Sequence, residues 1–344
     1  MCKRIILLRR YPEDSTGKTG LGVYSDNIAE GLIDRALPFE EIFFRMDLKD
    51  GFFRALRDGL IRPFLEVLKS RDRDAVYHAT DELCCAFFPF IPGRKVVTVH
   101  HVVRRTDGPQ GMYYRFWSAL TGMGISYADA VIAVSPQTRR EIVGRFPAAR
   151  DKVLALYSPI RKTYRDQGLE RGRVLGCIGE LIPRKNTSSA IRAFGILSSM
   201  TGMGDLILRI CGKGPEEDEL RTLAEDLGLA GRVEFVSGLT EEEVLDYYNT
   251  VSVLLNPSLH EGFGFVTLEA QRCGTPVVYF SGADIPEEVT RFAVASEDER
   301  DMAEKAFRVL TDDDYREHVT VAAREYSEDF GKDFIEGVTD TYGL

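Results

Sequence analysis

Short apolar runs alternate with helix-like segments along the whole chain. The apolar runs are continuous, as in strands of a parallel sheet that helices cover on both faces. Segments of roughly 10–18 residues with helical spacing lie between most of them, as βαβ units require. The predicted strands are 5–8, 41–46, 75–78, 95–100, 130–134 and 152–157 in the first half, and 173–179, 206–211, 232–236, 251–255, 276–280 and 291–295 in the second.

This alternation predicts an α/β protein with two doubly wound domains, because 344 residues exceed the ~250 at which a single core stops growing. Ligands are expected beyond the carboxyl ends of the strands. A polar, basic stretch without periodicity, 158–173, indicates the boundary between the domains. We therefore predict domains over 1–165 and 166–325, with a closing helical segment over 326–344.

The composition favours a globular protein and argues against a membrane-spanning or disulfide-stabilised one. Hydrophobic residues make up 44% of the chain, which is ample for two cores. No apolar run reaches the ~18 residues of a membrane-spanning helix, and the first run, Ile5 to Leu8, is too short for a signal peptide. Six cysteines without a CxxC pair favour a reducing compartment and argue against structural disulfides or zinc. A cytoplasmic protein is therefore expected, with the adjacent Cys84 and Cys85 as buried thiols.

The net charge differs between the halves. Residues 1–165 carry 27 Lys+Arg and 19 Asp+Glu, a net charge of +8, and the remaining residues carry 17 and 35, a net charge of −18, which gives −10 in total. Such asymmetry indicates that the halves face different partners. The cationic half is the one that needs an anionic partner, whereas a phosphate site in an acidic domain is built locally.

The strongest functional signal lies in residues 258–276. Glu261 and Glu269 lie on either side of a Gly-Phe-Gly turn and the beginning of an apolar helix. Carboxylates accept hydrogen bonds from vicinal hydroxyls, and glycines let backbone N–H groups reach a phosphate at a helix N-terminus. A ligand that combines a sugar, a diphosphate and a ribose matches this arrangement. The alternative is an ordinary turn-helix-strand unit with two solvated glutamates.

Two glutamates separated by seven residues around such a turn closely resemble the Glu-x7-Glu signature of retaining glycosyltransferases of family 4, which have the GT-B fold. The resemblance covers nearly the whole chain, more strongly over 173–290 than over 1–165. It implies two Rossmann-like domains facing across a cleft, the first for the acceptor and the second for the nucleotide sugar. It also implies that the segment 326–344 crosses back onto the N-terminal domain.

The resemblance implies roles for residues that follow the strands of the second half. Lys185 matches the lysine that neutralises the donor diphosphate, and a turn beside helix N–H groups suits this role. Glu180 stands where the family usually has arginine, so Arg184 is expected to supply the missing cation. Lys213, in a Gly-x-Gly-Pro turn, and Leu239, after the following strand, are expected near the nucleotide.

His100 ends a predicted strand in the first half, where the family places a histidine that faces the anomeric carbon. Its ordinary pKa suits hydrogen-bond and acid-base roles. The alternative is a core histidine that caps a loop. The five histidines of the chain show no metal-ligand spacing, and no metal site is predicted.

The loop 17–22 contains glycines that resemble the loop before the first GT-B helix, which closes over the donor phosphates. Gly20 and Gly22 are therefore expected to contact the donor. A P-loop is excluded because Pro12 stands where its first glycine must be, and a dinucleotide fingerprint would follow its strand immediately. A flexible loop without ligand contact is the remaining alternative.

Three helix boundaries are predicted from single residues. Asn186 is expected to cap the helix that follows Lys185. Pro215 is expected in the first turn of the next helix. Pro63 is expected to break or kink the basic amphipathic segment 51–71.

Taken together, the resemblance implies a retaining, metal-independent glycosyltransferase that uses a UDP- or GDP-linked sugar and no other cofactor. The rival interpretations are a non-catalytic nucleotide-sugar-binding protein and another GT-B enzyme such as a phosphorylase or an epimerase. The catalytic candidates are His100, Glu261, Lys185 and Arg184. The donor-binding candidates are Gly20, Gly22, Lys213, Leu239, Gly262, Phe263, Gly264, Phe265, Val266, Thr267 and Glu269.

The acceptor is not named by any motif, and no nucleic-acid partner is expected. The segment 51–71 carries arginines among apolar residues, and a basic amphipathic helix can lie on an anionic membrane. An ordinary helix packed on the sheet has the same pattern. An aromatic cluster over 113–117, with Arg104, Arg105 and Arg115 beside it, adds to the positive charge. These features favour an anionic acceptor, a lipid or polysaccharide precursor at the inner face of the membrane, and the alternative is a soluble acceptor.

Overall fold

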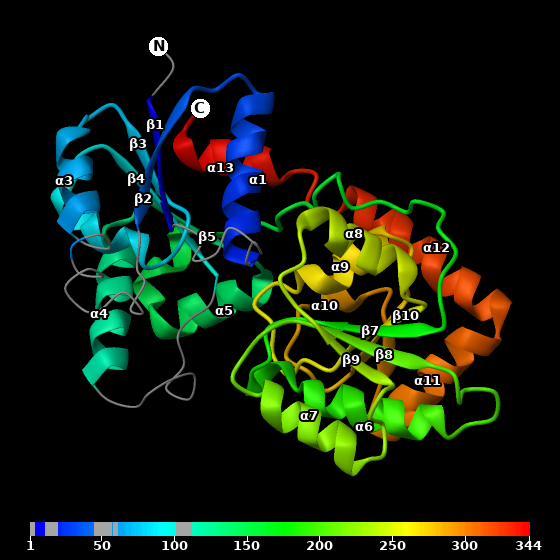
Figure 1. The fold of residues 1–344 in the computed structure, drawn as a ribbon. Coiled ribbons are helices and arrows are strands. Elements are labelled where there is room, and N and C mark those ends of the chain that lie inside the picture. The colour runs from blue at the N-terminus through cyan, green and yellow to red at the C-terminus, as the bar shows by residue number, and fades with distance from the viewer. Residues whose placement is uncertain (1–3, 11–19, 45–56, 58–60, 101–111) are drawn as a thin grey trace. The chain divides into compact units, whose positions relative to one another are not determined.

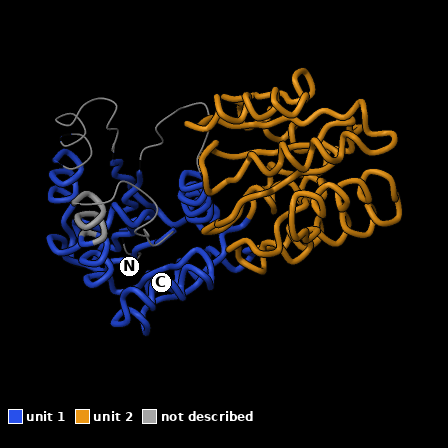
Figure 2. The backbone as a smooth tube through the Cα atoms, turned by 90° about the horizontal axis from the view of Figure 1, so that it is seen from below, with its two compact units in different colours: residues 1–159, 331–344 blue, residues 160–330 orange. Residues whose placement is uncertain are grey.

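The chain contains two compact units, each built on one sheet of six parallel strands (Figures 1 and 2). The computed structural model describes residues 4–10, 20–44, 57, 61–100 and 112–344. The first unit comprises residues 1–159 and 331–344, and the second comprises residues 160–330. The α/β class and the GT-B-like pair of doubly wound sheets are confirmed. The boundaries lie within a few residues of the predicted ones.

The first sheet has the strand order β2-β1-β3-β4-β5-β6. Its strands are β1 (Ile5–Arg10), β2 (Phe39–Phe44), β3 (Val76–Ala79), β4 (Arg94–Val99), β5 (Ala130–Ala133) and β6 (Val153–Ala155). The helices of this unit are α1 (Gly20–Asp34), α3 (Arg62–Lys69), α4 (Met112–Tyr127), α5 (Pro136–Arg145) and α13 (Phe334–Tyr342), with 3-10 helices at Cys84–Phe90 and Pro147–Lys152.

One face of this sheet packs against the 3-10 helix Cys84–Phe90 and helix α4. Cys84 and Cys85 are fully buried there, and burial raises the pKa of both thiols, so they are inert core residues as predicted. Gly124 on α4 is required by this packing, because a Cβ atom would lie 2.0 Å from the Cys85 sulfur. The five described cysteines are all free and buried.

The C-terminal helix α13 belongs to the first unit, as the resemblance implied. Phe334, Val338 and Tyr342 form its buried stripe at spacings of four residues. The Tyr342 hydroxyl lies 2.7 Å from Nδ1 of His78, whose Nε2 lies 2.9 Å from the Thr98 hydroxyl. Burial lowers the pKa of His78 to about 3, so this histidine is a neutral core residue.

The second sheet has the order β12-β11-β10-β7-β8-β9. Its strands are β7 (Val174–Ile178), β8 (Ile207–Cys211), β9 (Val233–Val236), β10 (Val253–Asn256), β11 (Val277–Phe280) and β12 (Val294–Ser296). The helices are α6 (Thr187–Ser198), α7 (Glu217–Asp226), α8 (Glu241–Thr250), α9 (Phe265–Arg272), α10 (Glu287–Thr290), α11 (Glu299–Thr311) and α12 (Asp313–Asp329), with a 3-10 turn at Pro183–Lys185.

Helices cover both faces of this sheet, which explains why its strands are largely apolar. Helices α6, α7 and α11 share one core with the strands, and α8, α9 and α10 lie on the other side (Figure 1). Gly176 on β7 allows α8 to approach closely, because a Cβ atom there would lie 2.9 Å from the Tyr247 hydroxyl. Tyr247 in turn donates to the carbonyl oxygens of Cys177 and Arg209, which ties α8 to the sheet.

Two features of the first unit bear on the predicted membrane contact. Pro63 lies in the first turn of α3, where its missing N–H costs no hydrogen bond within the helix. The predicted break or kink concerns the residues before α3, which are only partly described. Residues 51–56 and 58–60 of the basic segment lie outside the described part of the chain. In that described part, no helix is long and apolar enough to cross a membrane.

Candidate functional site

The catalytic candidates of the second unit lie in the loops that follow β7 and β10. These two strands are neighbours in the sheet, with β8 and β9 beyond β7 and with β11 and β12 beyond β10. The chain therefore leaves β7 and β10 toward opposite sides, and such a topological switch point is where doubly wound sheets bind their ligands. The loop after β7 carries Arg184 and Lys185, and the loop after β10 carries Glu261.

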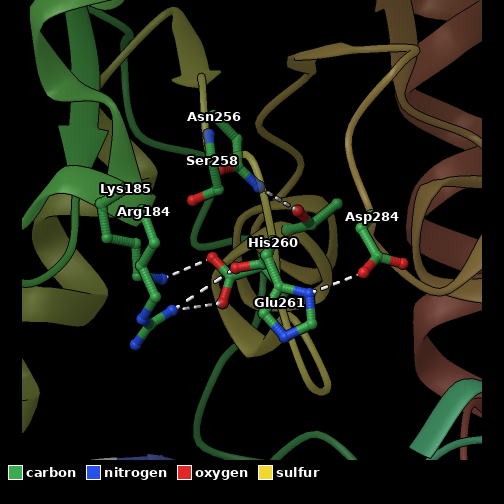
Figure 3. Close-up of polar contacts among 8 residues, drawn as sticks. Arg184, Lys185, Asn256, Ser258, His260, Glu261 and Asp284 are labelled. Atoms are coloured by element: carbon green, nitrogen blue, oxygen red, sulfur yellow. Dashed lines mark hydrogen bonds and ion pairs between the residues drawn. The ribbon is translucent and has the colours of Figure 1, made fainter. Parts of the chain in front are cut away.

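Lys185 and Arg184 converge on the carboxylate of Glu261 (Figure 3). The Lys185 ammonium lies 2.5 Å from Oε1, and Nη1 of Arg184 lies 3.4 Å from Oε2. Burial of Glu261 favours the protonated form, but the charge and hydrogen bond of Lys185, a hydrogen bond from Ser258 and the charge of Arg184 outweigh it. The pKa of Glu261 is therefore lowered, and the carboxylate stays ionised.

Backbone bonds fix the two loops against each other. The Leu259 N–H donates to the Arg184 carbonyl at 2.9 Å, and the Asn186 side-chain amide donates to the Pro257 carbonyl at 3.3 Å. Asn186 occupies the N-cap position of α6, but the predicted side-chain cap is wrong. Its backbone is left-handed, with φ of 52°, and its side-chain oxygen accepts from the Ser189 hydroxyl instead.

The turn after β8 packs directly on the turn after β7. A Cβ atom on Gly212 would lie 1.8 Å from the Gly179 carbonyl oxygen, and one on Gly214 would lie 2.2 Å from that of Leu181. Between these glycines, Lys213 is exposed. Helix α7 begins only at Glu217, so the prediction of a proline in its first turn is wrong by two residues.

The end of β9 lies beside this turn. A Cβ atom on Gly238 would lie 4.0 Å from the Lys213 ammonium, so Lys213 and the Gly238-Leu239 turn form one surface. Leu239 is half-buried there. The structure thus places Lys213 and Leu239 together, and Glu180, which replaces the usual arginine, is exposed at the beginning of the β7 loop.

Helix α9 begins at the predicted glycine turn. Gly264, with φ of 101°, is the residue before its first turn, a conformation that L side chains rarely adopt. Phe263 and Phe265 stack on each other with ring centroids 4.1 Å apart. Thr267 is buried, and its hydroxyl accepts from the Asn256 amide at 2.9 Å, so its side chain supports the turn. Gly262 and Val266 are half-buried beside these residues.

Glu269 lies in the second turn of α9, and its surroundings differ from those of Glu261. It is as buried as Glu261, and its Oε2 accepts from the Tyr248 hydroxyl at 2.9 Å. Burial is the dominant influence and raises the pKa of Glu269 to about 7, although the Tyr248 bond and the charge of Arg161 act in the opposite direction. At neutral pH such a carboxyl group is only partly ionised, and only its ionised form accepts hydrogen bonds at both oxygens without donating one.

Sequence reasoning did not identify Ser258, Tyr248 and Asp284. Ser258 bonds Glu261, and Asp284 holds Nδ1 of His260 at 2.9 Å beside that carboxylate (Figure 3). Ser258 follows β10 directly, a position that could have identified it. The partnership of Tyr248 with Glu269 depends on the packing of α8 against α9, and no motif shows it.

His100 lies at the carboxyl end of β4 in the first unit. Its Nε2 lies 2.9 Å from the Thr80 carbonyl oxygen, and its backbone N–H donates to the Glu82 carboxylate at 3.1 Å. A carbonyl oxygen only accepts, so Nε2 carries the proton in this contact. The ring also meets Tyr24 edge-on, with centroids 4.8 Å apart. Thr80 and Glu82 were missed, although polar residues directly after a buried strand are a recognisable signal.

The remaining predicted features of the first unit are only partly described. Gly20 and Gly22 were expected in the loop that precedes the first helix. They lie instead within the first turn of α1. The loop 11–19, Arg54, Arg104 and Arg105 lie outside the described residues, and so do the side chains of the cluster over 113–117.

Two family models match the chain. The model described as Glycosyltransferase Family 4 matches residues 37–162, and the model described as Glycosyl transferases group 1 matches residues 161–326. The chain belongs to the family 4 type of glycosyltransferases. Together the two matches cover residues 37–326, which include the β7 and β10 loops and every strand of the two sheets except β1.

Individual relatives agree with this assignment. The D-inositol 3-phosphate glycosyltransferase of Corynebacterium jeikeium (strain K411) is 31% identical over 54% of the chain and 44% of its own length. In the curated relatives, the matching part spans about half of the relative's length or less.

Two solved structures share the fold over nearly the whole chain. Sucrose-phosphate synthase from Thermosynechococcus elongatus superposes with a TM-score of 0.76 at 16% identity, covering 99% of this chain and 98% of that one. Anabaena HepE, solved with UDP and glucose, superposes with a TM-score of 0.73 at 17% identity and 99% coverage of both chains. At these identities the likeness shows the GT-B fold alone.

Proposed function

We propose that the protein is a retaining, metal-independent glycosyltransferase that transfers a sugar from a UDP- or GDP-linked donor to an acceptor. The observation that carries the proposal is the convergence of Lys185 and Arg184 on Glu261 at the β7–β10 switch point. Two cations and a buried, ionised carboxylate in one crevice suit a ligand that has both a diphosphate and sugar hydroxyls. The UDP bound to Anabaena HepE supports a uridine donor.

In this proposal, Lys185 and Arg184 neutralise the diphosphate as it leaves the sugar. Negative charge builds up on the leaving oxygens in the transition state, and positioned cations stabilise it. The first turn of α9, which begins after Gly264, adds N–H groups and the positive end of the helix dipole. Arg184 takes the place of the arginine that Glu180 replaces.

The remaining roles follow from burial and hydrogen-bonding capacity. Glu261 accepts hydrogen bonds from the sugar hydroxyls, and Glu269 accepts them from the ribose. His100 contacts the transferred sugar near its reacting carbon. Because Nε2 carries the proton that the Thr80 carbonyl accepts, Nδ1 is the unprotonated nitrogen of the neutral ring.

Donor turnover by purified protein tests the proposal against a binding protein without catalysis. Incubation with UDP- and GDP-sugars should release free nucleotide, and Lys185→Ala should slow this release by about 10²–10³-fold. NMR of the sugar product should show the anomeric configuration of the donor. Nucleotide binding without turnover would favour the binding protein, and a sugar phosphate or an epimerised sugar as the product would favour a phosphorylase or an epimerase.

For the acceptor we propose an anionic, lipid-linked precursor that the first unit meets at a membrane surface. On α3 and the neighbouring 3-10 helix, Ile61, Leu65 and Phe90 expose 47%, 50% and 52% of their surface. The exposed cations Arg62 and Lys69 lie on the same helix. Apolar side chains among cations suit an anionic lipid surface, to which each cation contributes about 1 kcal/mol.

Vesicle co-sedimentation tests this part of the proposal. The protein should bind vesicles that contain phosphatidylglycerol at low salt and should bind neutral vesicles less. Leu65→Asp should reduce binding to the anionic vesicles, whereas Leu227→Asp, at an exposed leucine of the second unit, should not. Absence of binding to both the anionic and the neutral vesicles would favour a soluble acceptor.

A further inference from the structure

Tyr248 is the partner of the Glu269 carboxylate. Its hydroxyl donates to Oε2 at 2.9 Å, and among the residues that the structure describes no second side chain hydrogen-bonds this carboxylate. Both side chains are buried, with 1% of Tyr248 and 7% of Glu269 exposed. Burial raises the pKa of Tyr248 well above its usual range, so the phenol keeps its proton and is the donor.

The phenol is held in place from several sides. The Tyr248 ring meets Tyr164 edge-on with centroids 5.7 Å apart, and it meets Tyr247 in the same way at 6.0 Å. Its backbone carbonyl accepts from Nη1 of Arg171 at 3.0 Å and from the Thr275 hydroxyl. The hydroxyl therefore has a fixed position, because backbone and ring are both anchored.

We propose that Tyr248 is a positioning residue for ribose recognition. By holding Oε2, it orients the carboxylate so that Oε1 remains for the ribose hydroxyls of the donor. Its hydrogen bond also favours the ionised form, the one that accepts from both hydroxyls. The inference rests on the proposed function, since it requires Glu269 to be the ribose ligand.

Other groups around Glu269 explain why this donor matters. Arg161, whose guanidinium pairs with Glu241 at 2.5 Å, favours ionisation of Glu269, and Glu241 opposes it. The Cys273 thiol at the end of α9 stays protonated because burial raises its pKa to about 12, so it contributes no charge. Burial exceeds the attractive influences, and the pKa of Glu269 is about 7. Near neutral pH, loss of the Tyr248 bond would therefore leave mainly the protonated acid.

The test compares nucleotides with and without ribose hydroxyls. Calorimetry measures UDP, GDP and their 2′,3′-dideoxy analogues on wild type and on Tyr248→Phe. We expect the variant to lose about tenfold in affinity for the better-bound ribonucleotide, as for a hydrogen bond to a charged group. Affinity for its dideoxy analogue should change less than about twofold. Equal losses for both nucleotides would overturn the proposal, as would no loss for either.

The pH profile gives a second readout that a structural role would not move. Wild-type preference for the ribonucleotide over the dideoxy analogue should fall as the pH drops below about 7. In Tyr248→Phe, this midpoint should move to higher pH, because the variant lacks the bond that favours the carboxylate. An unchanged midpoint would contradict the positioning role. The dideoxy analogue corrects for titration of the phosphates.

Tyr247→Phe is the matched control. The neighbouring hydroxyl donates to backbone carbonyls of β7 and β8, so its removal should lower stability without changing the ribose preference. If Tyr248→Phe folds poorly, Glu269→Gln tests the carboxylate that Tyr248 holds. This variant should abolish the preference for the ribonucleotide over the dideoxy analogue, together with its pH dependence. If wild type binds neither ribonucleotide, the proposed function fails as well. If wild type binds with a ribose preference that Tyr248→Phe retains, only this inference fails.

Discussion

The two glutamates of the signature segment differ in what surrounds them. Glu261 and Glu269 are both 7% exposed, yet the pKa of the first is lowered and the pKa of the second is raised to about 7. Lys185 and Arg184 face Glu261 directly, whereas Glu269 has one neutral donor and a cation that Glu241 already pairs. Burial alone therefore does not decide the charge of a carboxyl group, and the partners do.

Among the predicted effects, removal of Lys185, the cation nearest to Glu261, should have the largest one. Lys185→Ala should lower turnover of the nucleotide sugar by about 10²–10³-fold, because the leaving diphosphate and Glu261 both lose their nearest cation. Steady-state kinetics measure it. Lys305→Ala, which removes a lysine of α11 that pairs with Asp301, is the control and should leave turnover unchanged. Equal rates for Lys185→Ala and wild type would contradict the role of Lys185.

Glu269→Gln should change the pH dependence of stability. Folding raises the pKa of Glu269 from 4.5 to about 7, so the folded state binds more protons and stability falls as the pH rises through this window. The difference corresponds to roughly 3 kcal/mol of unfolding free energy. The variant should therefore match wild type near pH 4.5 and exceed it at pH 8.

Urea unfolding at several pH values measures this difference, and Glu261→Gln provides the opposite case. Folding lowers the pKa of Glu261, so its contribution is present at neutral pH and is lost as the pH falls through the lowered pKa. Glu261→Gln should therefore be less stable than wild type at pH 7. If both variants were more stable than wild type at neutral pH, or both less stable, the contrast between the two glutamates would be contradicted.

His100→Ala should have a smaller effect, on turnover rather than on nucleotide binding. We expect about a tenfold loss of turnover, because in the proposed mechanism the ring contacts the sugar and not the nucleotide. Affinity for free UDP or GDP should change little. The backbone bond to Glu82 survives the substitution, which limits structural damage. Loss of nucleotide binding or of folding would identify His100 as a core histidine.

Addition of EDTA should have the smallest effect. Turnover should remain within about twofold, because Lys185, Arg184 and helix N–H groups meet the charge of the leaving group. Assays after extensive dialysis against the chelator, with and without added Mg²⁺ or Mn²⁺, check this. A strong loss that either metal restores would contradict the metal-independent proposal.

Much of the fold could be predicted from the sequence because central strands such as β3 and β10 are buried along their whole length and therefore apolar. Each of the predicted apolar runs overlaps one of the strands of the two sheets. Lys185 and Glu261 could also be predicted together, since both follow strands whose carboxyl ends meet at one edge. The C-terminal helix was expected on the first unit only from the resemblance, and its stripe of Phe334, Val338 and Tyr342 shows why it docks there.

Features that depend on packing between distant segments could not be predicted. Asn186 has a left-handed backbone, and its side chain donates to the Pro257 carbonyl, 71 residues away. The Tyr248–Glu269 bond forms because α8 and α9 lie side by side. Local rules for caps and motifs consider only neighbours in sequence, so they miss both.

Binding of a nucleotide diphosphate and of its nucleotide sugar to Glu261→Gln and Glu269→Gln tests the central claim most directly. Titration calorimetry with UDP and UDP-glucose, and with GDP and GDP-mannose, should show that Glu269→Gln weakens both members of the bound pair. Glu261→Gln should weaken only the nucleotide sugar, because loss of its charge frees Lys185 for the diphosphate. Equal weakening of the free nucleotide by both variants would contradict the assignment of Glu261 to the sugar and Glu269 to the ribose.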